Sequence, residues 1–144
     1  MTSIIICLSA QQIKNIKNGD QTSIVIADAP KSEGATRIIL GQAGMNGEDG
    51  KLVGECISET QRVWHIGGII PDDLTRAACT DTWSIRGISR NGQKPVTEYL
   101  ISNVLMWSEA KDVTAFKRKG KPIATMPRSW SHIDCDGLSG GTQP

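Results

Sequence analysis

Residues 50–64, GKLVGECISETQRVW, carry the clearest pattern of apolar and polar positions in the chain. Leu52, Ile57 and Val63 interleave there with charged and polar side chains. This pattern predicts one long β-strand with one buried face and one face in water. Gly54 lies inside the strand, where a glycine indicates a bend, a bulge or a close approach of another backbone. A long bent strand is typical of a small barrel rather than of a flat sheet.

Four other apolar runs predict further strands. They cover residues 3–9, 22–27, 36–40 and 98–107. The run at 22–27 is expected to end at Pro30, because proline has no backbone N–H to donate to a neighbouring strand. The glycine breaks between these runs predict that the strands at 3–9, 22–27 and 98–107 join the long strand in one curved sheet or barrel.

Two short helices are expected beside the strands. The Ser9 hydroxyl can accept from the free amides of a first helical turn, and the apolar spacing after it predicts a helix that stops at Gly19. Pro71 is tolerated in a first turn and opens a second helix that runs to about Cys79. The acidic side chains of Asp72 and Asp73 are favourable at the positive N-terminal end of that helix.

The segments between these elements predict turns and loops. Residues 41–50 are a glycine-rich surface connection. Residues 80–97 show no regular spacing of apolar residues, so they predict neither a helix nor a strand. Residues 112–116 form a turn or a single helical turn. Residues 117–121 predict a basic turn, and residues 127–133 a closing segment. We therefore expect a single domain over residues 1–134, followed by a disordered tail at 135–144.

The charge of the chain is nearly balanced, with 16 Lys and Arg against 15 Asp and Glu, a net charge of +1. No global field therefore draws polyanions to the protein. The distribution is less even: residues 1–60 contain five cations against seven acids, whereas residues 108–144 contain six against four. An anion-binding face is expected to come mostly from the second half.

The four cysteines do not predict a metal site. Cys7, Cys56, Cys79 and Cys135 lie far apart, and the short spacing from His132 to Cys135 stands alone. Two of these thiols lie in strand-like runs, where a reduced cysteine acts as a small buried hydrophobe. We expect no metal and no cofactor. The first residues contain neither an apolar run of membrane length nor a basic leader, so a cytoplasmic protein without a membrane partner is expected.

Several segments, taken in order, resemble a known family. They are GDQTSIVI at 19–26, GKLVGE at 50–55, the strand at 99–107 and MPRSW at 126–130. This order resembles the ASCH domain, a member of the PUA-like β-barrel superfamily, over residues 3–134. The resemblance implies an α+β fold: a small pseudo-β-barrel of five to six strands with short flanking helices. It also implies a cleft used for RNA or nucleotide ligands.

The chain departs from the family at its signature. Gln21 stands where the family has a lysine, and Ile26 where it has an arginine. The amidohydrolase branch of the family, which removes acyl groups from modified cytidines, relies on that lysine and on a threonine three residues later, where this chain has Ile24. An uncharged amide and two aliphatic side chains cannot supply a cation or an activated nucleophile. Catalysis of this kind is not expected.

The candidate site residues come from the resemblance and from local chemistry. The ligand-binding candidates are Gln21, Thr22, Lys51, Arg128, Ser129 and Trp130, and the candidates for contact with a nucleic-acid backbone are Lys117, Arg118, Lys119 and Lys121. A tryptophan can stack on a base, but core packing is favoured for Trp107 and both roles stay open for Trp130. The basic run can track phosphates, although a solvated turn is the commoner role of such runs.

Three hypotheses for function follow. The favoured one is a non-catalytic module that binds RNA, a nucleotide or a modified base in the barrel cleft. The first alternative is a hydrolase acting on RNA or a modified nucleoside, for which Ser129, Lys51 and His132 supply the only polar chemistry. The second alternative is a protein-interaction module or inhibitor encoded by a phage or mobile element. The sequence does not indicate the oligomeric state.

Overall fold

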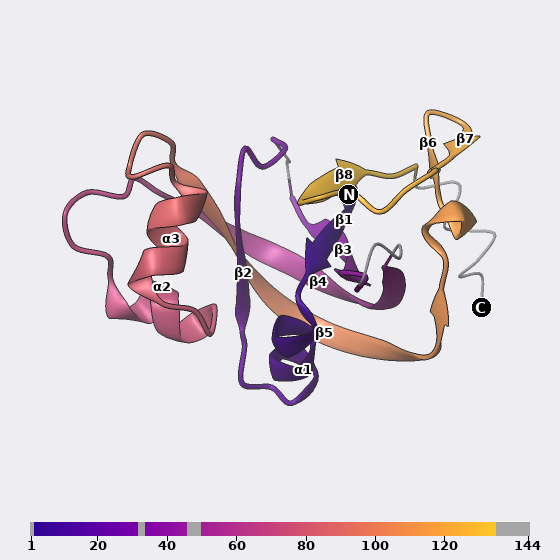
Figure 1. Ribbon diagram of the computed structural model, residues 1–144, viewed down its shortest axis with the longest axis horizontal. Helices are drawn as coiled ribbons and strands as arrows, with labels where there is room; N and C mark the ends of the chain where they lie inside the picture. Colours follow the sequence, from indigo (N-terminus) through magenta and orange to yellow (C-terminus); the bar gives the residue numbers. More distant parts are fainter. Residues whose placement is uncertain (1, 32–33, 46–49, 135–144) are drawn as a thin grey trace.

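The computed structural model describes residues 2–31, 34–45 and 50–134. Six strands form one curled sheet in the order β2-β5-β4-β3-β1-β8. Their bounds are β1 Thr2–Leu8, β2 Ser23–Ala27, β3 Thr36–Gln42, β4 Lys51–Trp64, β5 Val96–Lys111 and β8 Trp130–His132. β1 and β3 run parallel, and the other neighbours are antiparallel. The sheet curls into a half-barrel with a few short helices, so the expected α+β pseudo-barrel is confirmed (Figure 1).

The short elements lie on one face of this sheet and at its two ends. They are α1 Ala10–Lys17, α2 Asp72–Ala77, α3 Thr82–Ile88, the 3-10 turn η1 Val113–Ala115, and the hairpin strands β6 Lys117–Arg118 and β7 Lys121–Pro122. Figure 1 places α2 and α3 together at one end of the molecule and the β6–β7 hairpin at the other. None of the helices in the described ranges is long and apolar enough to cross a membrane.

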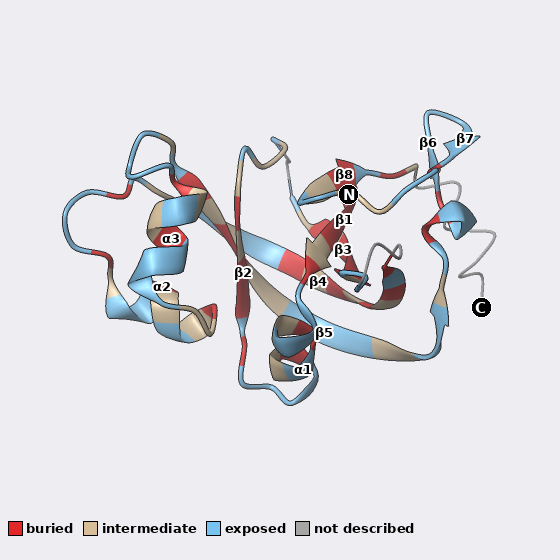
Figure 2. Ribbon diagram, viewed as in Figure 1, coloured by how far each residue is buried: buried red, intermediate tan, exposed pale blue. Residues whose placement is uncertain are grey.

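Three groups of buried side chains hold the sheet. The first group packs α1 against one face, through Ile13 and Ile16, and includes Ile4 and Ile6 of β1. Ile5 points to the opposite face, because successive side chains of a strand alternate, and it packs there under the segment from η1 to β7. The third group lies beneath α2 and α3. Figure 2 shows the buried positions concentrated on β1, β3 and the adjoining parts of β2 and β4.

The long strand β4 follows its prediction in extent but not in its buried side chains. The buried residues are Leu52, Gly54, Cys56 and Ser58, whereas Ile57 is half-buried. Val63 is 60% exposed, contrary to expectation. The physical reason is that β3 begins at Thr36, opposite Ser58, so the remainder of β4 pairs with β5 alone.

Gly54 marks an irregularity in pairing, as its sequence position predicted. The register with β5 shifts between Leu52 and Gly54. A Cβ atom at Gly54 would lie 2.6 Å from the carbonyl oxygen of Leu105, closer than a real Cβ approaches another atom. The glycine is therefore required by a close approach of two backbones.

The segment at 80–97, for which the sequence predicted no element, contains α3 and the start of β5. The Asp81 carboxylate caps α3 by accepting from the Ser84 amide at 2.7 Å, and this bond lowers the pKa of Asp81. Strand β3 also runs on to Gln42, into the segment predicted as a loop. Residues 46–49 of that segment and the tail at 135–144 lie outside the described residues.

Candidate binding site

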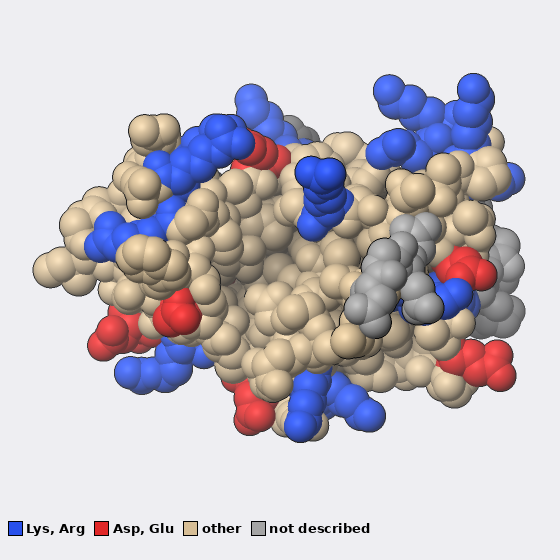
Figure 3. Space-filling model, viewed as in Figure 1, with Lys and Arg blue, Asp and Glu red and all other residues tan. Residues whose placement is uncertain are grey.

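The two edges of the curled sheet, β2 and β8, do not pair with each other. Between them lies a cavity of about 330 Å³, which we call the seam cavity. It is lined by Cys7, Leu8, Gln12, Val25, Ile26, Ala27, Ile88, Arg128 and Ser129. Figure 3 shows a hollow near the middle of the face that Figure 1 shows, with Lys and Arg side chains around it. Most of the lining is apolar, and the polar groups come from α1 and from the segment before β8.

Three side chains supply these polar groups. Arg128 and Ser129 are exposed, and neither side chain has a partner among the described residues. Gln12 accepts from the Ser9 amide through Oε1, which leaves its side-chain NH2 group to donate elsewhere. The cavity therefore offers one cation, one hydroxyl and one amide donor over an apolar lining.

Backbone pairing fixes the segment that carries Arg128 and Ser129. The Cys7 N–H donates to the Ser129 carbonyl at 2.8 Å, which extends the pairing of β1 with β8 by one residue. Burial raises the pKa of the Cys7 thiol, so this group stays protonated and is a poor nucleophile. The cavity wall is thus rigid on the β1 side and carries no reactive thiolate.

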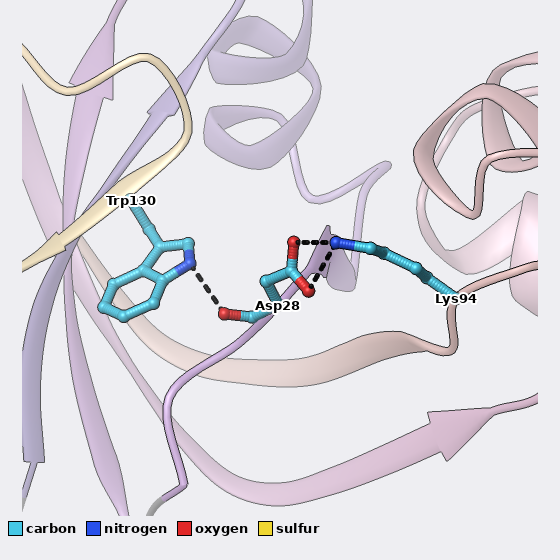
Figure 4. A network of polar contacts seen from close by, with 3 residues as sticks. All are labelled: Asp28, Lys94 and Trp130. Carbon is cyan, nitrogen blue, oxygen red and sulfur yellow. Dashed lines mark hydrogen bonds and ion pairs between the residues drawn. The ribbon is translucent and has the colours of Figure 1, made fainter.

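A side-chain network bridges the two sheet edges beside the cavity (Figure 4). The Trp130 indole N–H donates to the Asp28 carbonyl at 3.1 Å. Lys94 Nζ donates to both carboxylate oxygens of Asp28, at 3.1 and 3.3 Å. Asp28 has a φ of 52°, so the chain turns sharply just after β2. We call these three residues the seam bridge, because they connect β2, β8 and the loop before β5.

The ligand-binding candidates from the sequence do not share one cavity. Gln21 is only 2% exposed and donates to the Ser23 carbonyl, while its own Oε1 has no partner. Thr22 is held by backbone bonds to Ala77 and Ile101. Among the described lining residues of the seam cavity, neither of these two is present, and only Arg128 and Ser129 of the six candidates are.

Lys51, the remaining cleft candidate, lies elsewhere on the sheet. It begins β4 and forms an exposed ion pair with Asp112. Trp130 is half-buried, with its indole N–H engaged in the seam bridge and its ring edge-to-face with His132 at 5.0 Å between centroids. In this arrangement the Trp130 ring packs against His132 and does not present a free face to the seam cavity.

The three catalytic candidates are also separated. Ser129 lines the seam cavity, whereas His132 lines a different cavity next to the β6–β7 hairpin, and Lys51 pairs with Asp112. A nucleophilic serine needs a base within hydrogen-bond reach. The geometry does not give Ser129 either of the two bases considered from the sequence. Within the described ranges, no group of three or more His, Cys, Asp or Glu residues is placed to hold a metal ion.

The basic turn is an ordered hairpin rather than a loose loop. Lys119 and Gly120 form its tip, both with positive φ. The Asp134 carboxylate accepts from the amides of these two residues, at 2.9 and 2.7 Å. These bonds, the Gly120 amide first, lower the pKa of Asp134. Arg118 donates to the Ser131 hydroxyl at 2.8 Å, so one of the four cations of the turn is tied to β8.

The hairpin cations gather at one corner of the molecule (Figure 3). The lysines on either side of the tip, Lys117 and Lys121, are exposed, as is Lys119. A cavity of about 650 Å³ lies between the hairpin and β8, lined by Arg118, Lys119, Trp130, Ser131, His132 and Asp134. The four candidates for contact with a nucleic-acid backbone therefore lie together, next to the β8 edge of the sheet.

The sequence did not single out Gln12, Asp28 or Lys94, which contribute to the site. A signal was present for Gln12, because Ser9 and Gln12 form an S-x-x-Q capping box, in which each side chain bonds the backbone of the other. Asp28 and Lys94 are 66 residues apart, and no local pattern connects them. A contact of that kind becomes visible only when the sheet is folded.

Comparison with known proteins identifies the fold. Neither a protein-family model nor a curated protein sequence matches this chain. Among solved structures, an ASCH protein from Zymomonas mobilis matches with a TM-score of 0.67 and 14% identity, over 99% of this chain and 94% of that chain.

Two further solved structures are variants of the Zymomonas mobilis protein. A tyrosine-to-phenylalanine variant matches with a TM-score of 0.62 and 14% identity, over 99% of this chain and 98% of that one. A serine-to-alanine variant matches with a TM-score of 0.62 and 13% identity, over 99% and 95%. At this identity the likeness is one of fold, and the resemblance seen in the sequence motifs is confirmed at that level: the chain has the fold of an ASCH domain.

Proposed function

We propose that the protein is a non-catalytic module that binds single-stranded RNA or a nucleotide, with one base in the seam cavity. The observation that carries this proposal is the convergence of Arg128, Ser129 and Gln12 on an otherwise apolar cavity, with no partner among the described residues for their free groups. Ligand sites have this composition: an apolar lining with a few placed polar groups.

The cavity suits a nucleotide in size and in chemistry. Its volume of about 330 Å³ is at the lower end of the range for small-molecule sites. A base buries its faces against Leu8, Ile26 and Ile88, while the Gln12 amide donates to an acceptor on the base edge. The Arg128 guanidinium offers the paired donors that match a phosphate.

The β6–β7 hairpin supports a longer nucleic-acid ligand. Its cations lie next to Trp130 and Ser131 of β8, and the segment before β8 lines the seam cavity. A strand that leaves the cavity along β8 meets Lys117, Lys119 and Lys121, which release counterions when they contact phosphates. Arg118 then serves to hold the hairpin on β8 as well as to add charge.

Binding is favoured over hydrolysis because the site lacks the parts of an activated nucleophile. Gln21 and Ile24 are buried, at 2% and 1% exposure, in place of the family's lysine and threonine. Ser129 lies at the cavity, but the two bases considered for it are elsewhere. The seam cavity can therefore hold a base without a group that attacks it.

The test is a calorimetric titration that measures the affinity of the protein for nucleoside monophosphates and for single-stranded RNA. Arg128→Gln should weaken binding about tenfold, equivalent to about 1.4 kcal/mol, because a charge-assisted phosphate contact is lost. Ser129→Ala should weaken binding less. Arg62→Gln is the matched control, since Arg62 is an exposed arginine on the part of β4 that pairs with β5 alone.

Two results would overturn the proposal. If neither nucleotides nor RNA bind, the seam cavity is not a nucleotide site, and the hypothesis of a protein-interaction module is favoured instead. If the protein cuts RNA or deacylates a modified cytidine, and Ser129→Ala abolishes that activity, the hydrolase hypothesis replaces the binding module.

A further inference from the structure

Helix α1 separates two cavities. Successive residues of a helix are turned by about 100°, so Gln12 and Lys14 point to different flanks while Ile13 and Ile16 face the sheet. Gln12 lines the seam cavity on one flank. The second cavity, on the flank of Lys14 and Lys17, is a groove of about 540 Å³, which we call the α1 groove.

The α1 groove combines an apolar floor with a basic rim. It is lined by Ala10, Ile13, Lys14, Lys17, Asn18, Gln42, Val53, Met106, Trp107 and Ala110. Val53 and Met106 are half-buried and pack against the core group that includes α1. Trp107 lies at the β5 side of the groove, where its ring stacks on Phe116 at 6.3 Å between centroids and packs with the core group beneath η1. A flat apolar group that enters the groove can therefore contact the Met106 thioether and the Val53 side chain.

The charge around the groove is positive. Lys14 and Lys17 are exposed, have no partner among the described residues, and belong to a helix without acidic residues. The acids nearby are largely occupied: Asp112 pairs with Lys51, and Glu55 accepts from Arg37 and Trp107.

Two exposed acids lie near the groove in the chain: Glu109 on β5, two residues after Trp107, and Asp20, two residues after Asn18. Neither forms an ion pair with Lys14 or Lys17 among the described residues, so both ammonium groups of the rim are available to a ligand. An anionic ligand with a flat apolar part is therefore the occupant that the groove fits, and a nucleotide has both properties.

We infer that the α1 groove is a second nucleotide subsite, which takes a neighbouring nucleotide of the same RNA strand whose base occupies the seam cavity. This inference rests on the proposed function. The two cavities lie on opposite flanks of one helix, whose diameter with side chains is about 10–12 Å, a distance that a short single strand spans. Lys14 and Lys17 contact the phosphates, and the base lies against Met106 and Val53.

The arrangement predicts a ligand-length dependence that neither cavity gives alone. A mononucleotide fills the seam cavity only. A single-stranded RNA of about six nucleotides, within the site sizes of small single-strand-binding barrels, reaches both cavities. The longer ligand should therefore bind more tightly and with a steeper dependence on salt, because more phosphates are neutralised.

The test uses the double variant Lys14→Gln with Lys17→Gln. Its affinity for the RNA should fall about tenfold, and the slope of log K against log salt should fall by about 1.4, from about 0.7 for each of two phosphate contacts. Its affinity for a mononucleotide should not change. The matched control is Arg62→Gln with Arg76→Gln, which removes the same charge from exposed positions on β4 and α2.

The outcomes separate this inference from the proposed function. If a mononucleotide binds the parent protein, but the Lys14 and Lys17 variant binds RNA as well as the control variant does, the α1 groove is not a subsite and the inference is overturned. If neither ligand binds the parent protein, the proposed function fails, and the inference fails with it. A selective loss of RNA affinity and of salt slope supports both.

Discussion

The β4–β5 side of the half-barrel and the seam between β2 and β8 close the same sheet in different ways. β4 and β5 pair from Leu52 to Trp64, and at Gly54 the two backbones approach so closely that a methyl group does not fit. At the seam, the two edges are joined by the side chains of the seam bridge.

This difference decides where a ligand can bind. Backbone pairing of β4 with β5, although its register shifts near Gly54, satisfies polar backbone groups of both strands and leaves no cavity between them. Two edges joined mainly by side chains stand farther apart, so a cavity opens between them and nearby polar side chains keep free donors. Two polar side chains show this contrast. On β4, the Glu55 carboxylate accepts hydrogen bonds from Arg37 and Trp107. At the seam, the Arg128 side chain has no partner among the described residues.

The largest expected effect is on the paired side, at Gly54. Gly54→Ala places a Cβ atom against the Leu105 carbonyl, and a backbone neighbour cannot move aside as a side chain can. We expect a loss of about 3 kcal/mol in the free energy of unfolding, at the upper end of typical overpacking costs. Urea denaturation followed by circular dichroism measures it.

Gly87→Ala is the control for this change. Gly87 lies in α3, with no atom within 4 Å of an added Cβ. Alanine should be neutral there or should stabilise the helix by up to about 1 kcal/mol. Equal stability of the two variants would show that β4 and β5 tolerate more space than the structure indicates.

Glu55→Ala should have the next largest effect. It leaves the Arg37 guanidinium and the Trp107 indole N–H without their shared acceptor, at side-chain exposures of 14% for Arg37 and 20% for Glu55. We expect a loss of about 2 kcal/mol in the free energy of unfolding. Nucleotide affinity should not change. Glu59→Ala, at an exposed position of the same strand, is the control, and a loss of affinity in Glu55→Ala at unchanged stability would contradict the comparison.

The sequence predicted the paired side of the molecule well. The pattern at residues 50–64 gave the extent of β4, and Gly54 was recognised as a position of close approach or irregular pairing. Helix α1 was found from its Ser9 cap and its apolar spacing. These features are local: each depends on residues close together in the chain, so periodicity and capping rules detect them.

The seam could not be predicted in the same way. Its cavity combines side chains from β1, α1, β2, α3 and the segment before β8, and the Trp130–Asp28 bond joins residues 102 positions apart. Gln21 was expected at the cleft because of its place in a motif, but the fold turns its side chain inward. Helix α3 was missed because Gly87 and the exposed Trp83 break the apolar period, although Asp81 was present as a cap.

A smaller effect is expected from loosening the seam bridge. Trp130→Phe keeps a ring but removes the N–H that donates to Asp28. We expect a loss of about 1 kcal/mol in the free energy of unfolding, with faster amide hydrogen exchange in β2 than in β4. Lys94→Gln should cost less, because exposed ion pairs contribute about 0–1 kcal/mol. Uniform acceleration of exchange over all strands in Trp130→Phe would mean that the bridge does not act on the seam alone.

The smallest effect concerns the hairpin next to the open edge, and it depends on pH. The Gly120 and Lys119 amides hold the pKa of Asp134 below its unfolded value of about 3.9. A carboxyl with a lowered folded pKa stabilises the structure above the unfolded pKa, and this contribution is lost as the pH falls through the folded pKa. The amide resonances of Lys119 and Gly120 should therefore shift together below about pH 4. Asp134→Asn should remove that titration and leave the resonances of β4 unchanged, whereas a titration that persists in this variant would assign the anchor of the hairpin to another carboxyl.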